Sequence, residues 1–337
     1  MNRFEYVRAE SVAHAIQALA TPNAQALAGG TNLVDLMKYD VARPTRVVDI
    51  NRLPLRAIEE MPDGGLKIGA LVSNSDLAWE PRIVKRYPLL ASAILAGASA
   101  QLRNAATTGG NLLQRTRCYY FYDPSTPCNK RQPGSGCSAA LGINRIHAVL
   151  GASEHCIAVH PSDMCVALAA LDAIIHLEGP DGPRKLPFGD FHRLPEDRPQ
   201  DDNTMRPGEL ITAVELPRSD FIESYTYLKV RDRLSYAFAL VSVAAALRID
   251  RGAIIEARIA LGGVAHKPWR DRKVEDCLCG KVPDESTFAE CAASILRDAK
   301  GRGQNDFKIE LARRTIVRGL RQAAANMPQD QADKVVR

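Results

Sequence analysis

Four cysteines, Cys118, Cys128, Cys137 and Cys156, gather in one stretch that is rich in Pro and Gly. The chain has 337 residues and 8 cysteines, so this stretch holds half of them, which argues against an evenly spread disulfide framework. We therefore expect a metal centre. The spacing leaves the metal open, because no Cys-x-x-Cys pair occurs and both structural zinc and an iron–sulfur cluster accept four thiolates.

Other cysteines and histidines in the chain carry weaker signals. His147, His155 and His160 lie near the four cysteines in sequence and could replace a thiolate, although most such histidines are ordinary surface or core residues. Cys165 falls in an apolar helical stretch, and we expect it to be buried without a ligand. No cofactor is assigned to the remaining cysteines, Cys277, Cys279 and Cys291.

Two Gly-Gly turns could hold a phosphate. Gly109-Gly110 lies in QLRNAATTGGN, and Gly29-Gly30 lies in AQALAGGTNLVDLMK, between a short apolar strand and a helix. Glycine lets the backbone approach a ligand closely, and free N–H groups at such a turn attract anions. Taken alone, the Gly29-Gly30 turn fits an ordinary strand-to-helix connection equally well. Together, the two turns could grip both ends of one pyrophosphate.

Two common nucleotide-binding motifs are absent. No glycine follows Gly30 at the spacing of G-x-G-x-x-G, although Asp49 ends a strand where that motif would place its acid, so we expect Asp49 to be structural. The chain also has no Gly-Lys-Ser or Gly-Lys-Thr, which excludes a P-loop. ATP is therefore not indicated.

Alternating helix and strand patterns surround these turns. Ser11 is a suitable N-cap for the helical pattern SVAHAIQALA. LKIGALV predicts a strand, and helices are expected near Asn74 and over Ala91–Ala98. The first part of the chain thus follows an α/β pattern.

The second half predicts a separate unit. Residues 179–209 are polar and turn-rich, as in a long surface excursion, and ELITAVELP reads as a strand that closes the first domain. Three antiparallel strands then follow in YTYLKVR, ALVSVAAALRI and EARIALGGV, before helices at about 286–300 and 307–326. We expect an α+β fold with a first domain at 1–219 that holds the cysteine loop at about 115–158, a second domain at 221–327 and a mobile tail at 328–337.

Charge and hydropathy exclude some classes. The net charge of +5 is small for this length and the basic residues are interspersed with acids, so nucleic-acid binding is not expected. No apolar run approaches the roughly 20 residues that span a bilayer, so no membrane partner is expected. MNRFEYVRAE contains neither an apolar signal core nor a twin-arginine pair.

Several motifs resemble those of one known family, in the same order. LAGGTNL, QLRNAATTGGNL, PSDMCVALAALDA and YLKVRDRLSYAFALVSVAAAL are similar to motifs of the FAD-binding subunit of the molybdenum hydroxylases, which include xanthine dehydrogenase and aldehyde oxidoreductase. The resemblance covers nearly the whole chain. It implies a two-part FAD-binding domain followed by a C-terminal α+β domain with a three-stranded antiparallel sheet and helices.

The resemblance also implies roles for individual residues. Both Gly-Gly loops would bind the FAD pyrophosphate through backbone amides, Asp163 would meet the sugar portion, Ile211 would pack on the ring system, and Lys229 would lie near the polar edge of the flavin. The implied FAD-binding residues are Ala26, Leu27, Ala28, Gly29, Gly30, Thr31, Asn32, Leu33, Val34, Thr107, Thr108, Gly110, Asn111, Ser162, Asp163, Ile211 and Lys229.

Two of these residues have simpler alternative explanations. Asp163 stands where a helix should begin, so it could serve as an N-cap or stabilise the helix dipole without a ligand. Lys229 lies in an apolar, strand-like run, where a lysine is more often a surface residue. A cation near the flavin would instead stabilise the negative charge of its reduced ring.

The cysteine loop departs from the common form of the family, in which the GGN motif passes almost directly into the PSD motif. It resembles the subset, found among bacterial periplasmic aldehyde oxidoreductases, whose flavin subunit carries an additional [4Fe–4S] cluster. In that interpretation Cys118, Cys128, Cys137 and Cys156 are the four ligands. Because the loop lacks regular apolar periodicity, we expect the cluster to help it fold.

No convincing group of residues for transforming a substrate is found, nor a molybdopterin site. The resemblance implies an oxidoreductase subunit that takes electrons from a molybdenum subunit and a [2Fe–2S] subunit, in a heterotrimer, and passes them from FAD to an external acceptor. It also implies a periplasmic location reached through the export signal of a partner, with the cytoplasm as the alternative. The competing hypothesis is a zinc-stabilised assembly or interaction module without redox activity.

Overall fold

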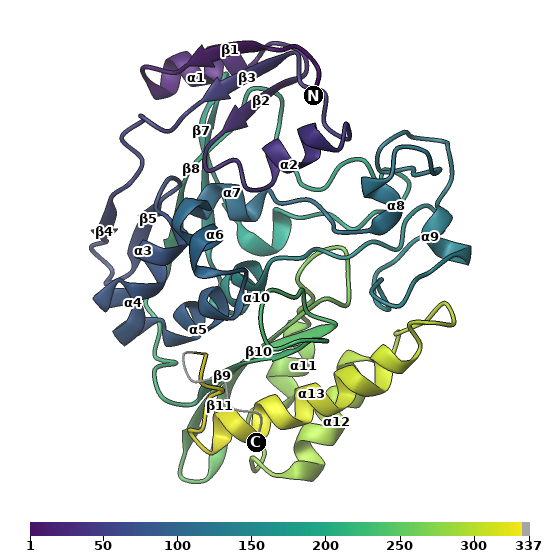
Figure 1. The fold of residues 1–337 in the computed structure, drawn as a ribbon. Coiled ribbons are helices and arrows are strands. Elements are labelled where there is room, and N and C mark those ends of the chain that lie inside the picture. Colours follow the sequence, from purple (N-terminus) through teal and green to yellow (C-terminus); the bar gives the residue numbers. More distant parts are fainter. Residues whose placement is uncertain (332–337) are drawn as a thin grey trace.

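The computed structural model describes residues 1–331, beginning with a small parallel sheet (Figure 1). Its strand order is β1-β3-β2, and the helix α1 follows the first strand. Ser11 caps this helix as predicted, since its hydroxyl accepts a hydrogen bond from the His14 N–H. The elements of this part are β1 (Glu5–Arg8), α1 (Val12–Leu19), β2 (Ala24–Leu27), α2 (Leu33–Lys38) and β3 (Arg46–Asp49).

A five-stranded antiparallel sheet and a group of short helices complete the first half. The strand order is β4-β5-β8-β6-β7. The strands are β4 (Ile58–Glu60), β5 (Leu66–Gly69), β6 (Ile174–Gly179), β7 (Gly182–Pro187) and β8 (Leu210–Leu216). The helices are α3 (Asn74–Trp79), α4 (Pro81–Arg86), α5 (Pro88–Ala96), α6 (Ala100–Ala105), α7 (Thr108–Leu112) and α10 (Asp163–Ala170). A continuous apolar core joins α5, α10 and this sheet.

The segment 179–209 is less irregular than its sequence suggests. Its first part forms strand β7, paired with β6 in a hairpin, and a 3-10 turn at Phe188–Asp190 follows. Phe188, Phe191 and His192 are buried. Only the remainder matches the expected surface excursion. Strand β7 was not predicted, because it is an edge strand whose side chains are half exposed and mostly polar, so its sequence resembles that of a loop.

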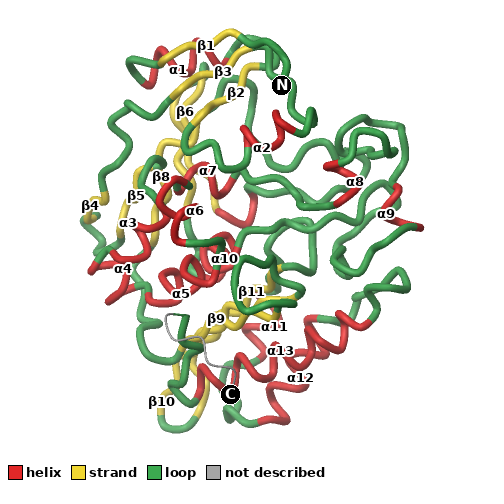
Figure 2. Tube along the Cα trace, in the orientation of Figure 1, coloured by secondary structure: helices red, strands yellow, loops and turns green. Residues whose placement is uncertain are grey.

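The second half forms a three-stranded antiparallel sheet in the order β11-β10-β9, with helices on one face (Figure 2). This confirms the predicted α+β fold class. Val243 and Ala245 of β10 share a core with Ala312 and Ile316 of α13. The elements are β9 (Tyr225–Val230), β10 (Val241–Asp250), β11 (Ala253–Gly262), α11 (Arg272–Cys277), α12 (Glu285–Ile295) and α13 (Phe307–Ala324).

The cysteine loop stands out to one side of both halves and contains only two short helices, α8 (Tyr119–Tyr122) and α9 (Ser138–Leu141) (Figure 1). It buries more apolar side chains than its sequence suggests. Phe121, Ala139 and Ile157 pack with three of the cysteines and with Leu36 of α2. The loop therefore has a small apolar centre that the sequence pattern did not reveal.

The last described residues contact the second sheet. The Gln329 N–H donates to the Thr226 hydroxyl, and the Gln331 side chain donates to the Tyr227 carbonyl. Residues 332–337, most of the predicted mobile tail, lie outside the described residues. Within the described part, none of the helices combines the length and the apolar character needed to cross a membrane.

A buried lysine fixes the end of the cysteine loop to the second half. The Lys308 side chain of α13 donates to the carbonyls of Ile146, His147 and Gly263, at 3.2, 2.7 and 2.5 Å. Lys308 has no exposed surface. The Lys308 side chain thus satisfies two backbone acceptors of the loop and one that follows β11, which joins the two segments.

We expect Lys308→Met to destabilise the protein by about 2–4 kcal/mol, because three buried carbonyls lose a charged donor. The free energy of unfolding, measured by urea titration, tests this. The control is Lys281→Met, which removes an exposed ion pair with Glu290 at 3.0 Å and should cost less than about 1 kcal/mol. Equal losses in the two variants would contradict the anchoring role.

Candidate cofactor site

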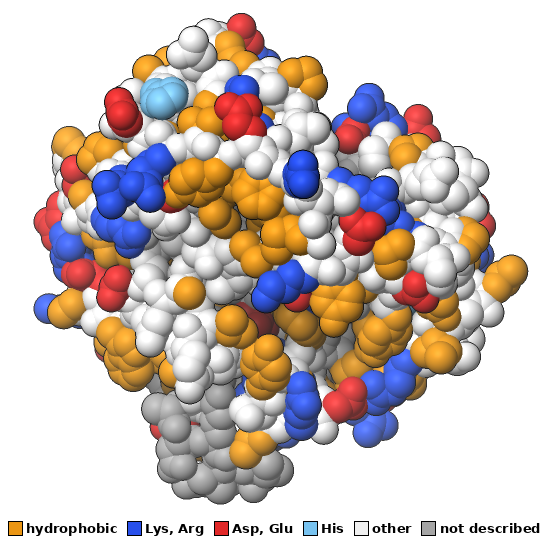
Figure 3. All heavy atoms as spheres, turned by 45° about the horizontal axis from the view of Figure 1, so that its top comes forward, with side chains coloured by type: hydrophobic (Ala, Val, Ile, Leu, Met, Phe, Trp, Pro, Cys, Tyr) orange, Lys and Arg blue, Asp and Glu red, His pale blue; other side chains and the backbone are white. Residues whose placement is uncertain are grey.

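A cavity of about 1630 Å³ lies between the two Gly-Gly turns, helix α10 and strand β9. This exceeds the roughly 300–1,000 Å³ of a typical small-molecule pocket and suits a dinucleotide-sized ligand. Figure 3 shows the opening as a central hollow, with hydrophobic side chains around it and Lys and Arg side chains at its margin. The cavity wall thus combines apolar side chains with polar ones, and charged residues of both signs are among its lining.

The first Gly-Gly turn is shaped to bring backbone against this cavity. A Cβ on Gly29 would lie 1.9 Å from the Ala105 carbonyl oxygen, so only glycine lets the two turns pack together. Gly30 has a φ of +72°, which also favours glycine. Among residues 1–331, the N–H groups of Gly29, Gly30 and Thr31 find no hydrogen-bond partner. Three amides therefore stay available for an anion.

The second turn is fixed by its own threonine. The Thr107 hydroxyl accepts from the Gly110 N–H at 3.2 Å and caps α7. A Cβ added to Gly110 would meet only this hydroxyl, at 2.9 Å. The Thr108 hydroxyl instead donates to the buried Val72 carbonyl, away from the cavity. Thr107 and Gly110 thus shape the wall, and Thr108 supports the turn.

Polar side chains link the turns to the rest of the site. Asn32 accepts from the Arg115 N–H at 2.9 Å, while its side-chain N–H₂ group is buried without a partner. Ser162 donates to Asn111 at 2.5 Å. Because a buried donor without a partner is costly, the unpaired Asn32 amide fits a ligand acceptor in the cavity.

The structure brings nearly all the sequence-predicted cofactor residues to this one cavity. Leu27 and Thr108 are the exceptions, since neither forms part of the wall. The residues on the wall are Ala26, Ala28, Gly29, Gly30, Thr31, Asn32, Leu33, Val34, Thr107, Gly110, Asn111, Ser162, Asp163, Ile211 and Lys229. Their individual contacts with a cofactor stay predictions.

A buried ion pair lies in the cavity wall. The Lys229 ammonium group donates to the Asp163 carboxylate at 2.7 Å and to the Ala96 carbonyl at 3.1 Å. The Tyr227 hydroxyl donates to the other Asp163 oxygen at 2.7 Å and accepts from the Ser242 hydroxyl at 3.0 Å. Burial and the Asp163 charge raise the pKa of Tyr227 well above its ordinary value, so its hydroxyl stays a donor.

This geometry rejects the capping role for Asp163 and the surface position for Lys229, while Asp163 keeps its place in the first turn of α10, where it also favours the helix dipole. Ser162, rather than Asp163, caps α10, because its hydroxyl accepts from the Cys165 N–H at 3.0 Å. Lys229 is 7% exposed and is not a surface residue. Tyr227, which does not line the cavity, supports Asp163 from behind the wall, and sequence reasoning missed it although it lies in the Tyr-x-Lys motif that located Lys229.

The four cysteines of the loop surround a second, much smaller pocket. Cys128 and Cys137 face each other across an isolated antiparallel bridge. Burial raises the pKa of Cys118 to about 12 and that of Cys156 to about 11. Buried thiols without a strong partner suit an ion or a cluster that binds the thiolate form.

The three histidines near the cysteines in sequence take different positions relative to this pocket. His147 is buried, and its Nε2 lies 3.1 Å from the Cys118 sulfur. Burial lowers the pKa of His147 to about 4, so the ring is neutral. His155 contributes to the pocket wall but is largely exposed. His160 lines the large cavity instead.

Comparison with known proteins finds matches over both halves of the chain. Residues 2–219 match the model of the "FAD binding domain in molybdopterin dehydrogenase", and residues 225–323 match the "CO dehydrogenase flavoprotein C-terminal domain". The aldehyde oxidoreductase FAD-binding subunit PaoB of Escherichia coli is 49% identical over 96% of this chain and 99% of its own.

More distant relatives share the whole length. The glyceraldehyde dehydrogenase medium chain of Sulfolobus acidocaldarius is 28% identical, over 95% of this chain and 98% of its own. Among solved structures, quinoline 2-oxidoreductase from Pseudomonas putida 86 has a TM-score of 0.74 at 26% identity, over 97% of this chain and 99% of that chain. The two halves therefore occur together in all these proteins.

We expect Gly110→Val to fold and to lose bound FAD, because the added side chain enters the cavity and meets only the Thr107 hydroxyl. Gly30→Val is expected to lose FAD too, but with backbone strain from its positive φ. The FAD-to-protein ratio from the visible spectrum, with circular dichroism as a check of folding, measures the effect.

Gly189→Val is the matched control for this test, because a Cβ there meets nothing within 4 Å. It should keep the full FAD content. A folded Gly110→Val protein with a normal FAD content would contradict the assignment of this turn to the pyrophosphate.

Proposed function

Because this chain belongs to the family of FAD-binding subunits of the molybdenum hydroxylases, we propose that it is the FAD-carrying electron-transfer subunit of a molybdenum-dependent aldehyde oxidoreductase. The observation that carries the proposal is the meeting of the two Gly-Gly turns with the Asp163–Lys229 pair around one cavity. The name of the 49% identical relative, an aldehyde oxidoreductase subunit, supports the aldehyde as substrate class.

The residues of the cavity divide the binding of FAD between them. The free N–H groups of Gly29, Gly30 and Thr31 and the unpaired Asn32 amide are donors for the pyrophosphate. Ile211, buried in β8, offers an apolar face for the ring system. Bound FAD supplies electron transfer singly or in pairs.

We further propose that the cysteine loop holds a [4Fe–4S] cluster through Cys118, Cys128, Cys137 and Cys156. All four cysteines line one small pocket, which supports a single shared centre. Four thiolates are the usual complement of a cluster in which each thiolate binds a different iron.

His147 is a further contact of this centre. With its Nε2 at 3.1 Å from the Cys118 sulfur, the neutral ring is placed to donate a hydrogen bond to a thiolate there. Hydrogen bonds to ligand sulfurs are one of the protein's means of tuning a cluster.

The proposal includes a molybdenum subunit and a [2Fe–2S] subunit as partners, and an external electron acceptor. The support is that relatives are named as the medium chain of a glyceraldehyde dehydrogenase and of a carbon monoxide dehydrogenase, which implies further chains. We also propose a periplasmic location, with export on a partner's signal. Cell fractionation of the native host tests it, and a purely cytoplasmic signal for this chain would reject it.

The alternative of a zinc-stabilised interaction module makes the opposite spectroscopic prediction. The full chain purified under anaerobic conditions should be yellow-brown, with a flavin spectrum and about four irons per chain if the proposal holds. Zinc in the cysteine loop without a chromophore would overturn it.

We expect Lys229→Ala to lower the reduction potential of bound FAD, because it leaves the buried Asp163 carboxylate uncompensated beside the reduced, anionic ring. A redox titration measures the shift. The double variant Lys229→Ala/Asp163→Asn removes both charges and should recover most of it. A single variant with an unchanged potential would reject an electrostatic role.

Cys137→Ser should lower the iron content and the cluster signal in electron paramagnetic resonance of the dithionite-reduced protein, because one of four ligands is lost. It should also destabilise the loop, although the apolar packing around Phe121 limits this effect. The matched control is Cys291→Ser, which is buried among α12 and α13 and should keep the cluster. Full iron in Cys137→Ser would contradict the ligand set.

A further inference from the structure

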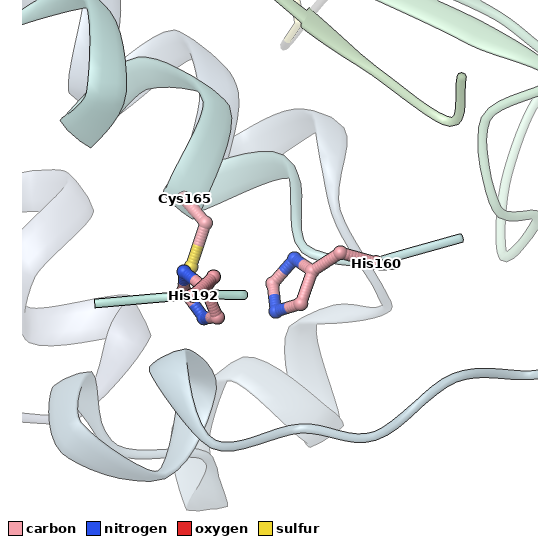
Figure 4. A group of neighbouring side chains, drawn as sticks. All are labelled: His160, Cys165 and His192. Atoms are coloured by element: carbon pink, nitrogen blue, oxygen red, sulfur yellow. The ribbon is translucent and has the colours of Figure 1, made fainter. Parts of the chain in front are cut away.

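Three side chains that no cofactor assignment uses converge beside the large cavity (Figure 4). His160 comes from the segment before α10, Cys165 from the first turn of α10, and His192 from the segment after Phe188–Asp190. Their ligand atoms all lie within 4.8 Å of one another and are buried. The two imidazole rings have centroids only 4.3 Å apart.

The hydrogen bonds of this group are incomplete. His192 Nε2 lies 2.9 Å from the Leu112 carbonyl, which assigns the ring proton to Nε2 and leaves Nδ1 as a free lone pair. His192 Nδ1 and both ring nitrogens of His160 are buried without a partner. Native proteins leave few buried polar atoms unpaired, so three in one cluster require an explanation.

A ligand in the flavin cavity could reach His160 but does not explain the unpaired Nδ1 of His192. Cys165 and His192 do not line the large cavity; of the three residues only His160 does. None of the three lines the pocket of the cysteine loop. The cluster is therefore distinct from both sites described above, although it adjoins the first.

We propose that His160, Cys165 and His192 bind one Zn²⁺ ion, with His192 coordinating through Nδ1. Two imidazoles and a thiolate match the borderline-soft character of zinc, and three protein ligands leave a fourth position for water. The Leu112 carbonyl fixes the tautomer and orientation of His192, as outer contacts of zinc ligands do. Binding releases the Cys165 thiol proton to solvent.

The ion has a structural role at the cavity. It joins the excursion around His192 to the start of α10, where Ser162 contacts Asn111 and Asp163 contacts Lys229. These three ligands come from segments that are otherwise connected by packing. Zinc therefore holds the N-terminal end of α10 in the position that completes the cavity wall.

The test is metal analysis of the full-length chain, produced in zinc-supplemented medium and treated with a mild chelator. About one zinc per chain is expected, in addition to iron. His192→Ala and Cys165→Ala should each lose this zinc and keep the iron of the cysteine loop. Cys137→Ser should do the reverse and keep the zinc.

His176→Ala is the matched control, because His176 is a half-buried histidine paired with Glu215 at 2.6 Å, outside the cluster. It should keep the zinc. If His192→Ala fails to fold, Cys165→Ala provides the same test with a smaller change, since it removes only a sulfur. Cobalt substitution supplies a second measurement: a thiolate-to-cobalt charge-transfer band that is absent in Cys165→Ala supports the site.

The possible outcomes separate clearly. One equivalent of zinc, or of copper in its place, that is lost in both His192→Ala and Cys165→Ala supports the site, and copper would correct only the identity of the ion. Wild-type protein with no metal beyond iron after growth in zinc would overturn the proposal. So would zinc that persists in both His192→Ala and Cys165→Ala.

Discussion

The structure around the cavity depends on one buried ion pair, between Asp163 and Lys229. It joins the start of α10 to strand β9, and the Lys229 ammonium group also reaches the end of α5 at the Ala96 carbonyl. Two desolvated charges are unfavourable unless further hydrogen bonds satisfy them. Here the Tyr227 hydroxyl donates a further hydrogen bond to the Asp163 carboxylate. Helices α10 and α5 of the first half and strand β9 of the second half are therefore held in one arrangement, which gives the cavity a defined wall.

Polar anchors play a comparable part in the cysteine loop. The Lys130 ammonium group, almost fully buried, donates to Asp202 and the Pro199 carbonyl, and Lys308 gathers three carbonyls at the other end. Although burial alone would raise it, Lys130 and Arg115 hold the pKa of Asp202 well below its usual range. These polar contacts and a small apolar centre contribute to ordering the loop, in addition to any bound cluster. The loop is therefore a tethered insertion rather than a free one.

Much of the local structure could be predicted from the sequence. The Ser11 cap, the Gly29-Gly30 turn, the three strands of the second half and its last two helices follow from short-range patterns and occur where the sequence predicts them, although the helix expected at about 286–300 ends at Ile295. Gly109-Gly110, expected as a turn, lies instead within the short helix α7. Strand β7 and the core of the cysteine loop were missed. Neither segment shows a clear hydrophobic periodicity in its sequence. Strand β7 is a half-exposed edge strand, and the cysteine loop packs through isolated apolar side chains.

The sequence by itself determined the turns, the caps and the motifs, because each depends on residues a few positions apart. Only the tertiary structure decided which residues became partners. Lys229 read as a surface lysine until folding placed it 2.7 Å from Asp163, and Cys165, buried as expected, has His160 and His192 beside it only in the folded chain. Burial and pairing are properties of contacts between distant segments, and a lysine, a cysteine or a histidine has no single role until those contacts are set.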